Sequence, residues 1–339
     1  MSAEALTVRP GCVDRCGNVD IPYPFGIGKD CFRGDGFEIS CGKDSVPLLV
    51  GMNIRVLNLS LSPHPVARVV RPVAWQCSNS AGNTTSGPLL KDMITLNPTG
   101  VYRISRDLNE LVVLGCNTLG LVTSGQLFMA CLAFANDLSN LQDGACWGAG
   151  CCSIDLPLGL TNIMVAISSV SSTKLDDCPC NYAFIVDKSY YSFQKADLHM
   201  NGSQTSMPLS LDWAIRDNSN LSWTCADAAT RPGFACKSVH SECVNSNNGP
   251  GYTCNCTKGY EGNAYVDNGC TVTGRLEIDQ LNSMGLEIRR GSGQRPGAGT
   301  RGDAAVTEAR GVRRQAGRQG RGRATGVGVS PCSDEAAKD

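Results

Sequence analysis

The stretch CVNSNNGPGYTCNCTKGYEGNAYVDNGC, Cys243–Cys270, carries four cysteines, two of them separated by a single residue. Extended back to Cys225, it holds six cysteines with 10, 6, 10, 1 and 13 residues between successive ones. A piece of this size buries little apolar surface, and small domains compensate with cross-links. We therefore expect three disulfide bonds here, which sequence alone allows in fifteen arrangements.

Cysteine usage outside this stretch points the same way. The chain has 19 cysteines in 339 residues, with twelve from Cys12 to Cys180, six from Cys225 to Cys270, and Cys332 alone. Two even clusters are typical of pairwise disulfides, which persist in oxidising compartments. Zinc sites favour two matched Cys-X2-4-Cys pairs, whereas the spacing here is mixed, so no metal site is expected. No cofactor is expected either.

Sequons agree with an extracellular or cell-wall location. Asn-X-Ser/Thr acceptors, the candidate glycosylation sites, occur at Asn58, Asn83, Asn201, Asn220 and Asn255. The first residues, MSAEALTVRPGC, contain no apolar run of the length that a signal peptide needs, and no window has the length of a membrane span. We expect a truncated or soluble form of an exported protein.

Charge and composition divide the chain. Residues 1–106 hold 11 Lys/Arg against 8 Asp/Glu, a net charge of +3, whereas residues 107–270 hold 7 against 15, a net charge of −8. Residues 271–339 are rich in Gly, Arg and Ala and poor in large apolar residues, so we expect a disordered tail. Arg-Gly-Asp at 301–303 is one candidate adhesion motif, and the arginines of the tail are candidate RNA-binding residues. We favour a solvated tail without either function.

The body of the chain shows the two-residue period of strands. NIMVAISSV at 162–170 alternates Ile163, Val165 and Ile167 with smaller or more flexible side chains. YAFIVD at 182–187, NELVVLGC at 109–116 and PVARVVRPVAW at 65–75 predict further strands, with Pro72 limiting the last to an edge or a bend. Helical periodicity is scarce, so we expect a mainly β, disulfide-rich fold.

The cysteine stretch resembles the epidermal growth factor-like (EGF-like) module. Its specific features are Cys254-Asn255-Cys256 followed by Gly259-Tyr260-Glu261-Gly262. The resemblance implies the pairs Cys225–Cys243, Cys236–Cys254 and Cys256–Cys270. Calcium-binding modules open with an acidic cluster directly before the first cysteine, whereas here Asp217 lies eight residues too early. We expect no calcium site.

A second resemblance covers about 11–270. GCVDRCGNVDIPYPFGIGKDCFRGDGFEISC at 11–41 is similar to the galacturonan-binding domain of plant wall-associated receptor kinases, and GACWGAGCCSIDLP and CNYAFIVD are similar to later landmarks of the same ectodomain. Composition and the resemblance together predict four parts: a galacturonan-binding-like cysteine-rich domain at 11–106, a second β-rich cysteine-containing part at 107–215, an EGF-like module at 225–270 and the tail at 271–339. No Gly-rich loop, His-Arg-Asp or Asp-Phe-Gly kinase motif occurs, and we expect no enzyme.

The basic first third is the expected ligand site, because pectic galacturonan carries one carboxylate per sugar and suits Arg or Lys forks beside flat apolar faces. The candidates are Arg15, Lys29, Arg33, Lys43, Arg55, Arg68, Arg71, Arg103, Arg106, Tyr23, Phe25 and Phe32. The expected partner is oligo- or polygalacturonate, with cell-wall proteins as a further partner of the EGF-like module and no nucleic acid. The alternatives are a structural or protein-interaction module without a sugar ligand, or a truncated gene product without function.

Overall fold

The computed structural model describes residues 8–79, 83–87, 94–170, 178–199, 205–216 and 224–273. These residues all belong to one compact unit, Met1–Glu287. Strands dominate them, with one short α-helix and one 3-10 turn, so the predicted mainly β, disulfide-rich fold is confirmed. Cys332, the motif at 301–303 and all of the tail beyond residue 273 lie outside the described residues.

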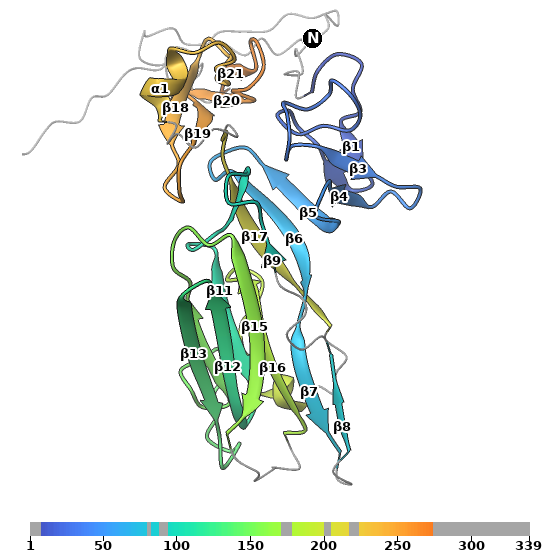
Figure 1. Ribbon diagram of the computed structural model, residues 1–339, viewed down its shortest axis with the longest axis vertical. Coiled ribbons are helices and arrows are strands. Elements are labelled where there is room, and N and C mark those ends of the chain that lie inside the picture. The colour runs from blue at the N-terminus through green and yellow to red at the C-terminus, as the bar shows by residue number, and fades with distance from the viewer. Residues whose placement is uncertain are drawn as a thin grey trace, which may run out of the picture. The chain divides into compact units, whose positions relative to one another are not determined.

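The N-terminal part begins with a two-stranded hairpin, β1 (Arg15–Cys16) and β2 (Val19–Asp20). A six-stranded antiparallel sheet follows, in the order β10-β17-β6-β5-β4-β3 (Figure 1). Its strands are β3 (Ile39–Cys41), β4 (Pro47–Leu49), β5 (Ile54–Ser60), β6 (Val66–Pro72), β10 (Tyr102–Ile104) and β17 (Ser206–Trp213). Disulfides Cys12–Cys31 and Cys16–Cys41 close the loops before this sheet.

Two further antiparallel sheets pack face to face. One has the order β14-β11-β16-β7-β8 and the other β13-β12-β15-β9. Their strands are β7 (Ala74–Ser78), β8 (Thr84–Ser86), β9 (Ile94–Thr95), β11 (Asn109–Leu114), β12 (Asn117–Ser124), β13 (Leu127–Phe134), β14 (Cys151–Asp155), β15 (Asn162–Ser169) and β16 (Cys180–Asp187). A Cβ built on Gly120 would lie 2.2 Å from the Val113 side chain, so the close approach of β12 to β11 requires glycine there.

Four disulfides strengthen this sandwich. Cys131–Cys152 joins the outer strands β13 and β14, one from each sheet. The others are Cys77–Cys180, Cys116–Cys178 and Cys146–Cys151. The segment after β16 carries a 3-10 turn, Lys195–His199, which buries Leu198. Cross-linked edges restrict the unfolded chain and so supplement a core of modest size.

The last described part is built from two hairpins and the α-helix. Strands β18 (Ser241–Asn245) and β19 (Tyr252–Cys256) form one hairpin, and β20 (Tyr260–Gly262) and β21 (Cys270–Val272) form the other. Helix α1, Cys225–Ala229, starts at Thr224 with a capping box in which Thr224 and Asp227 satisfy each other's backbone N–H. The structure joins Cys225 to Cys243, Cys236 to Cys254 and Cys256 to Cys270, the pairs that the EGF-like resemblance implies.

One apolar core extends from the N-terminal hairpin to these last hairpins. Trp213 lies at its centre, with ring centroids 5.1 Å from Phe25, 5.8 Å from Phe37 and 5.6 Å from Tyr265. Its indole Nε1 donates to the Ser60 carbonyl at 3.0 Å, so the polar atom of this buried ring is satisfied. The EGF-like module therefore shares its core with the β-sheets.

The predicted strands are found, at slightly different bounds. Residues 162–170 contain β15, 182–187 lie in β16, and 109–116 contain β11. The stretch at 65–75 contains β6, which ends at Pro72, and the start of β7, which belongs to a different sheet. Backbone pairing joins residues on both sides of residue 106, the expected boundary between the first two parts of the chain, because β6 pairs with β17 and β7 pairs with β16.

Candidate functional site

A cleft of about 420 Å³ opens between the N-terminal loops and the EGF-like module. Its charged lining residues are Arg9, Arg33, Asp35, Arg216, Arg231 and Lys237, five cations against one carboxylate. Its aromatic lining residues are Tyr23, Phe37, Phe234 and Tyr252. We call this feature the basic cleft. A concave surface with a local charge of 5 − 1 = +4 attracts anions, and its low-dielectric walls strengthen the attraction.

The N-terminal wall of the cleft is held by arginine hydrogen bonds. The Arg9 guanidinium lies 4.6 Å from the centroid of the Tyr23 ring and donates to the Tyr23 hydroxyl at 2.9 Å. The Arg9 Nη1 also donates to the Asp30 carbonyl at 2.9 Å. Arg33 reaches across the cleft and donates from Nη2 to the Gly233 carbonyl at 2.5 Å. Among the described residues, Arg9 and Arg33 are oriented by backbone and phenol oxygens rather than by carboxylates, so no carboxylate there neutralises their positive charge.

Arg216 forms the floor of the cleft, and most of its guanidinium donors are already bonded to backbone carbonyls. Its guanidinium donates to the carbonyls of Pro250 at 2.6 Å and Asn248 at 3.0 Å, and also to the Val101 carbonyl. Burial, together with the nearby charge of Arg103, lowers the Arg216 pKa to about 9. Arg216 is therefore still protonated at neutral pH, and contributes a field more than free donors.

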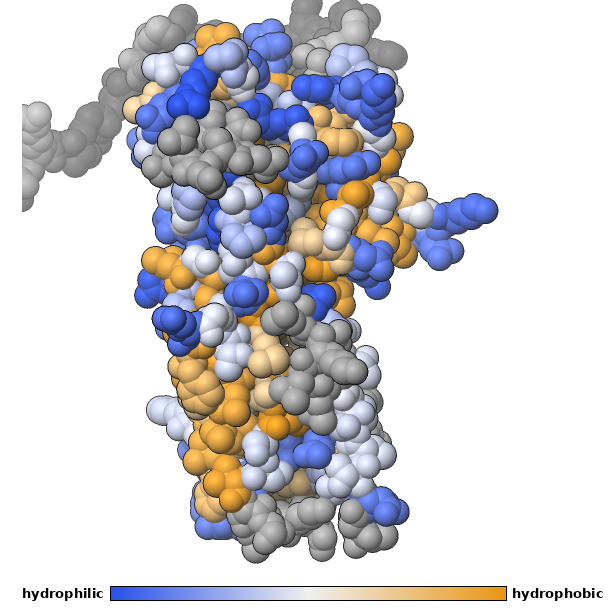
Figure 2. Space-filling model, viewed as in Figure 1, coloured by the Kyte–Doolittle hydropathy of each residue, from blue (hydrophilic) through white to orange (hydrophobic). Residues whose placement is uncertain are grey.

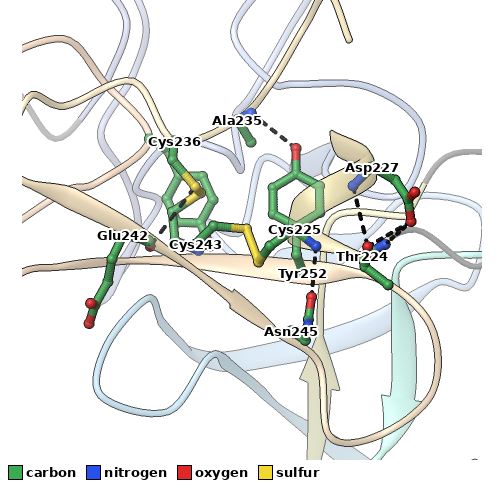
Figure 3. The surroundings of a disulfide bond; sticks show 11 residues. Thr224, Cys225, Asp227, Ala235, Cys236, Glu242, Cys243, Asn245 and Tyr252 are labelled. Carbon is green, nitrogen blue, oxygen red and sulfur yellow. Dashed lines mark hydrogen bonds between the residues drawn. A yellow bond between two sulfur atoms is a disulfide. The ribbon is translucent and has the colours of Figure 1, made fainter. Parts of the chain in front are cut away.

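The EGF-like wall depends on Tyr252, which comes from β19 (Figure 3). Its hydroxyl accepts a hydrogen bond from the Ala235 N–H at 3.0 Å, beside the Cys225–Cys243 disulfide. Its ring stacks on Phe234 at 5.6 Å between centroids. This contact fixes the loop that carries Arg231 and Lys237, both of which are exposed on the cleft side of the module.

Buried contacts hold the two walls in register. Tyr252 and Ile215 exchange backbone hydrogen bonds at 2.8 and 3.2 Å. The Asn263 amide donates to the Tyr23 carbonyl at 2.7 Å. Asn248, which is 1% exposed, donates to the Ile104 carbonyl at 3.0 Å and accepts from the Gly159 N–H at 2.8 Å. The cleft is thus preorganised by the fold.

Two of the residues predicted from sequence line the basic cleft, Arg33 and Tyr23. Other cationic candidates, Lys29, Lys43, Arg55 and Arg106, are exposed and outside its lining, and Arg15 is exposed and paired with Asp20 at 2.6 Å. The remaining aromatic candidates pack inward: Phe25 is fully buried and Phe32 is half-buried against the core.

Three of the arginines predicted to bind ligand instead lie buried or half-buried in contacts within the fold. Arg103 is 4% exposed, and its guanidinium donates to the carbonyls of Tyr102 at 2.7 Å and Gly100 at 3.2 Å, while burial lowers its pKa. Arg68 donates to the buried Asp187 carboxylate at 2.8 Å. Arg71 is half-buried beside the sheet residues Ile94 and Phe184. None of the three lines the basic cleft.

Four cleft cations lie outside the sequence-based set, Arg9, Arg216, Arg231 and Lys237. Arg216, Arg231 and Lys237 belong to the region of net charge −8, where composition gives no hint of a basic surface. Arg9 precedes the first cysteine and lies just outside the stretch at 11–41 that carries the family resemblance. The pairing of distant segments by the fold brings them together, and local composition carries no signal of it.

Three of the five candidate glycosylation sites lie among the described residues. Asn58 and Asn83 are exposed and Asn255 is half-buried, while Asn201 and Asn220 lie outside the described residues.

Within the part of the chain that the structure describes, no group of three or more His, Cys, Asp or Glu side chains could hold a metal ion. None of the helices described is long and apolar enough to cross a membrane.

The fold and the cleft together define a class. Nine disulfides, stacked antiparallel sheets and a closing EGF-like module are the architecture of a domain built for an oxidising, extracellular environment. The basic cleft adds a preformed hollow with five cations and one carboxylate in its lining. No solved structure matches the chain.

Comparison with known proteins identifies the family. Residues 12–71 match the family described as "Wall-associated receptor kinase galacturonan-binding", and residues 143–223 match "Wall-associated kinase". Wall-associated receptor kinase 2 of Arabidopsis thaliana is 35% identical over 271 residues, which cover 77% of this chain and 34% of that protein. The chain belongs to the wall-associated receptor kinase family and carries the ectodomain part of it.

Other relatives from the same plant cover a similar region. Wall-associated receptor kinase 4 is 30% identical over 272 residues, covering 77% of this chain and 34% of that protein. Wall-associated receptor kinase-like 10 is 27% identical over 323 residues, covering 78% of this chain and 39% of that protein. The chain thus spans about a third of the length of the curated relatives it matches.

Proposed function

We propose that this chain binds pectic galacturonan in the basic cleft, as the ligand-binding part of a wall-associated receptor ectodomain. The observation that carries the proposal is the cluster of five cations against one carboxylate in a preformed hollow. The match of residues 12–71 to a galacturonan-binding family supports it, because Arg33 and Tyr23 of that region line the same hollow.

The chemistry of the cleft suits a polyuronate. Arg33, Arg231 and Lys237 present cations at the edge of the hollow, where successive carboxylates of one polymer chain could each meet a charge. The Arg216 guanidinium at the floor of the cleft adds positive charge to the site. Its donors are already bonded to backbone carbonyls, so it attracts the ligand without hydrogen-bonding it. The half-buried Phe234 offers apolar surface at the cleft that suits the C–H face of a pyranose ring.

The EGF-like module takes part in this proposal as one wall of the site. Arg231, Lys237 and Tyr252 come from the module, whereas Arg9, Tyr23 and Arg33 come from the N-terminal loops. Binding would therefore require both parts, at the cell wall or outside the cell, where the disulfides persist. Cell-wall proteins are proposed as further partners of the outward faces of the module.

Binding of the full chain to de-esterified polygalacturonate, measured by isothermal titration at several salt concentrations, tests this function. We expect binding at low salt that weakens gradually as salt rises, because screening shortens the reach of exposed charges to about 8 Å near physiological ionic strength. Methyl-esterified pectin, whose carboxylates are neutralised, should bind less. Equal binding of the two polymers would contradict the ionic mechanism, and no binding to either would favour a protein-interaction module.

A further inference from the structure

A second hollow, of about 290 Å³, lies on the outer face of the sheet β14-β11-β16-β7-β8. Val112 of β11 and Ser153 of β14, which lie directly opposite each other, are at its floor, whereas Val113 faces Gly120 of the other sheet. In Figure 2, hydrophobic side chains gather along the side of the molecule where Figure 1 draws β13, a strand of that other sheet. We call the second cavity the Trp147 hollow. It shares no lining residue with the basic cleft.

Trp147 lines this hollow from a rigid turn. Its side chain is 83% exposed, the most exposed of the large apolar side chains that the structure describes. The backbone around it is held by two hydrogen bonds, from the Gly148 N–H to the Cys151 carbonyl at 2.7 Å and from the Ser153 N–H to the Cys146 carbonyl at 3.0 Å. The Cys146–Cys151 disulfide closes the same turn. An aromatic ring on a fixed turn loses little freedom when a ligand stacks on it.

Glu110 supplies the single charge of the lining. It is half-buried in β11 and makes no hydrogen bond or ion pair with another residue that the structure describes. The carboxylates around it are already engaged. Asp155, opposite Glu110 in β14, pairs with Lys188 at 2.7 Å, and Asp197 accepts a hydrogen bond from the Tyr191 hydroxyl at 2.8 Å. The Glu110 oxygens therefore have their acceptor capacity available for a ligand.

Three hydroxyl-bearing side chains, Ser153, Tyr191 and Ser192, complete the polar part of the lining. The Tyr191 hydroxyl donates to Asp197, which fixes its direction and leaves its lone pairs to accept. Burial raises the pKa of Tyr191, and the charges of Asp197 and Glu110 raise it further, so the phenol stays protonated. A hydroxyl oxygen can both donate and accept, so this lining matches a ligand that carries hydroxyl groups of its own.

The same lining disfavours other classes of ligand. None of the described residues that line the hollow is Lys, Arg or His, and the charge of Glu110 repels anions, uronates included. Val112 and Phe193 are buried, so apart from Trp147 the lining offers little apolar surface to a lipid or an apolar peptide. A cation could stack on Trp147 and meet Glu110, but ammonium and guanidinium groups carry donors only and cannot accept from the hydroxyl groups.

We propose that the Trp147 hollow binds a neutral sugar unit, stacked by its C–H face on Trp147 and bonded through its hydroxyl groups to Glu110 and the serine hydroxyls. Its volume is at the low end of the roughly 300–1,000 Å³ of small-molecule sites, which suits a short saccharide unit. A neutral wall polysaccharide and the glycan of a glycoprotein both present this chemistry. Because the hollow and the basic cleft have separate linings, a chain that failed to bind galacturonan would leave this proposal standing.

Saturation-transfer difference NMR of the unaltered full chain tests the proposal with three neutral probes: cellotetraose, β-1,4-galactotetraose and a high-mannose N-glycan. We expect at least one probe to bind, with the strongest transfer to the C–H groups on one face of a ring. Its Kd should change by less than about twofold between low and physiological salt, because the ligand carries no charge to be screened. Binding of either of the first two probes points to a wall polysaccharide, and binding of the third points to a glycoprotein. No transfer to any of the three overturns the proposal.

Variants locate the bound probe. Trp147→Ala should weaken binding by at least about tenfold, whereas Phe128→Ala, at a 63% exposed ring on β13, should leave the Kd unchanged. Glu110→Gln should weaken it by no more than about tenfold, because an amide also accepts from hydroxyl groups. Binding that Trp147→Ala leaves unchanged overturns the proposal. So does a preference for tetralysine, a cationic probe, over the neutral probes that disappears in Glu110→Gln and at high salt.

Discussion

The side-chain amide of Asn248 donates to the carboxylate of Asp212, with 2.8 Å between Nδ2 and Oδ2. Asn248 belongs to the loop between β18 and β19 of the EGF-like module, and Asp212 belongs to β17 of the central sheet. The same Asn248 side chain also bonds the Ile104 carbonyl and the Gly159 N–H. One buried asparagine therefore connects the module to three segments of the β-sheets and helps to set the width of the basic cleft.

Replacing Asn248 by alanine should destabilise the protein by roughly 2–4 kcal/mol, because several buried polar groups would lose their partners at once. Urea unfolding followed by tryptophan fluorescence measures this. Asn247→Ala is the matched control, since Asn247 is exposed and its own side chain makes no hydrogen bond among the described residues. Equal unfolding free energies for the two variants would refute the role of Asn248.

Asp212 predicts an unusual pH dependence. Burial raises its pKa above the ordinary carboxyl value of 3.8, and the hydrogen bonds from Asn248 and Ser105 oppose this only in part. A carboxyl group with a raised folded-state pKa costs stability when it is ionised, and the cost disappears as pH falls through that pKa toward 3.8. Asp212→Asn should therefore gain unfolding free energy relative to the parent at pH 7 and lose this advantage near pH 3. A difference independent of pH would contradict the assignment.

Asp187 should behave in the opposite way. Burial opposes its ionisation, but hydrogen bonds from Ser189 and Ser210 and the Arg68 guanidinium outweigh burial, and its pKa lies below 3.8. Its stabilising contribution is present above the unfolded-state pKa and is lost as pH falls through the folded-state value. Asp187→Asn should cost roughly 1–3 kcal/mol at pH 7, limited by the partial exposure of Arg68, and less in acid. Acid titration of unfolding free energy checks the sign, and a cost that grows in acid would be inconsistent with it.

The disulfide pattern gives a chemical prediction. Nine pairs account for all 18 cysteines from Cys12 to Cys270, which leaves Cys332 as the nineteenth. Non-reducing peptide mapping of secreted protein should find Cys332 unpaired or capped and the other cysteines linked. Free thiols at several of the first 18 positions would argue against the extracellular assignment.

Much of the fold was predictable from local pattern. The alternation of Ile163, Val165 and Ile167 predicts β15, and the apolar run at 182–187 predicts part of β16, because both signals lie within one strand. The EGF-like pairing followed from resemblance alone, since spacing leaves fifteen arrangements open. Sheet order was not predictable, because pairing such as that of β6 with β17 joins residues that lie more than 130 positions apart.

The candidate site was predictable only in part. Arg33 and Tyr23 line the basic cleft, but sequence gives no means of separating them from Arg103, whose guanidinium is buried among loop carbonyls. Phe25 reads as a possible ring platform in IPYPFGIG, yet it packs on Trp213 at 5.1 Å. Whether such a residue is exposed or buried depends on long-range packing. The composition of its own segment therefore does not predict its exposure.

The central claim, that galacturonan binds in the basic cleft, is tested most directly by reversing the two cations that the EGF-like module contributes. Arg231→Glu with Lys237→Glu lowers the local charge from +4 by four units to zero. The control is Lys43→Glu with Lys258→Glu, the same change in net charge at two exposed lysines outside the cleft. Matching the total charge separates the position of the cations from their number.

Titration of full-length parent, cleft variant and control with de-esterified polygalacturonate at low salt provides the measurement. The account predicts that the cleft variant binds roughly tenfold more weakly or worse, while the control stays within about twofold of the parent. Unchanged thermal unfolding of both variants confirms that the fold is intact. Equal affinities for the cleft variant and the parent, or a loss confined to the control, would contradict binding in the basic cleft.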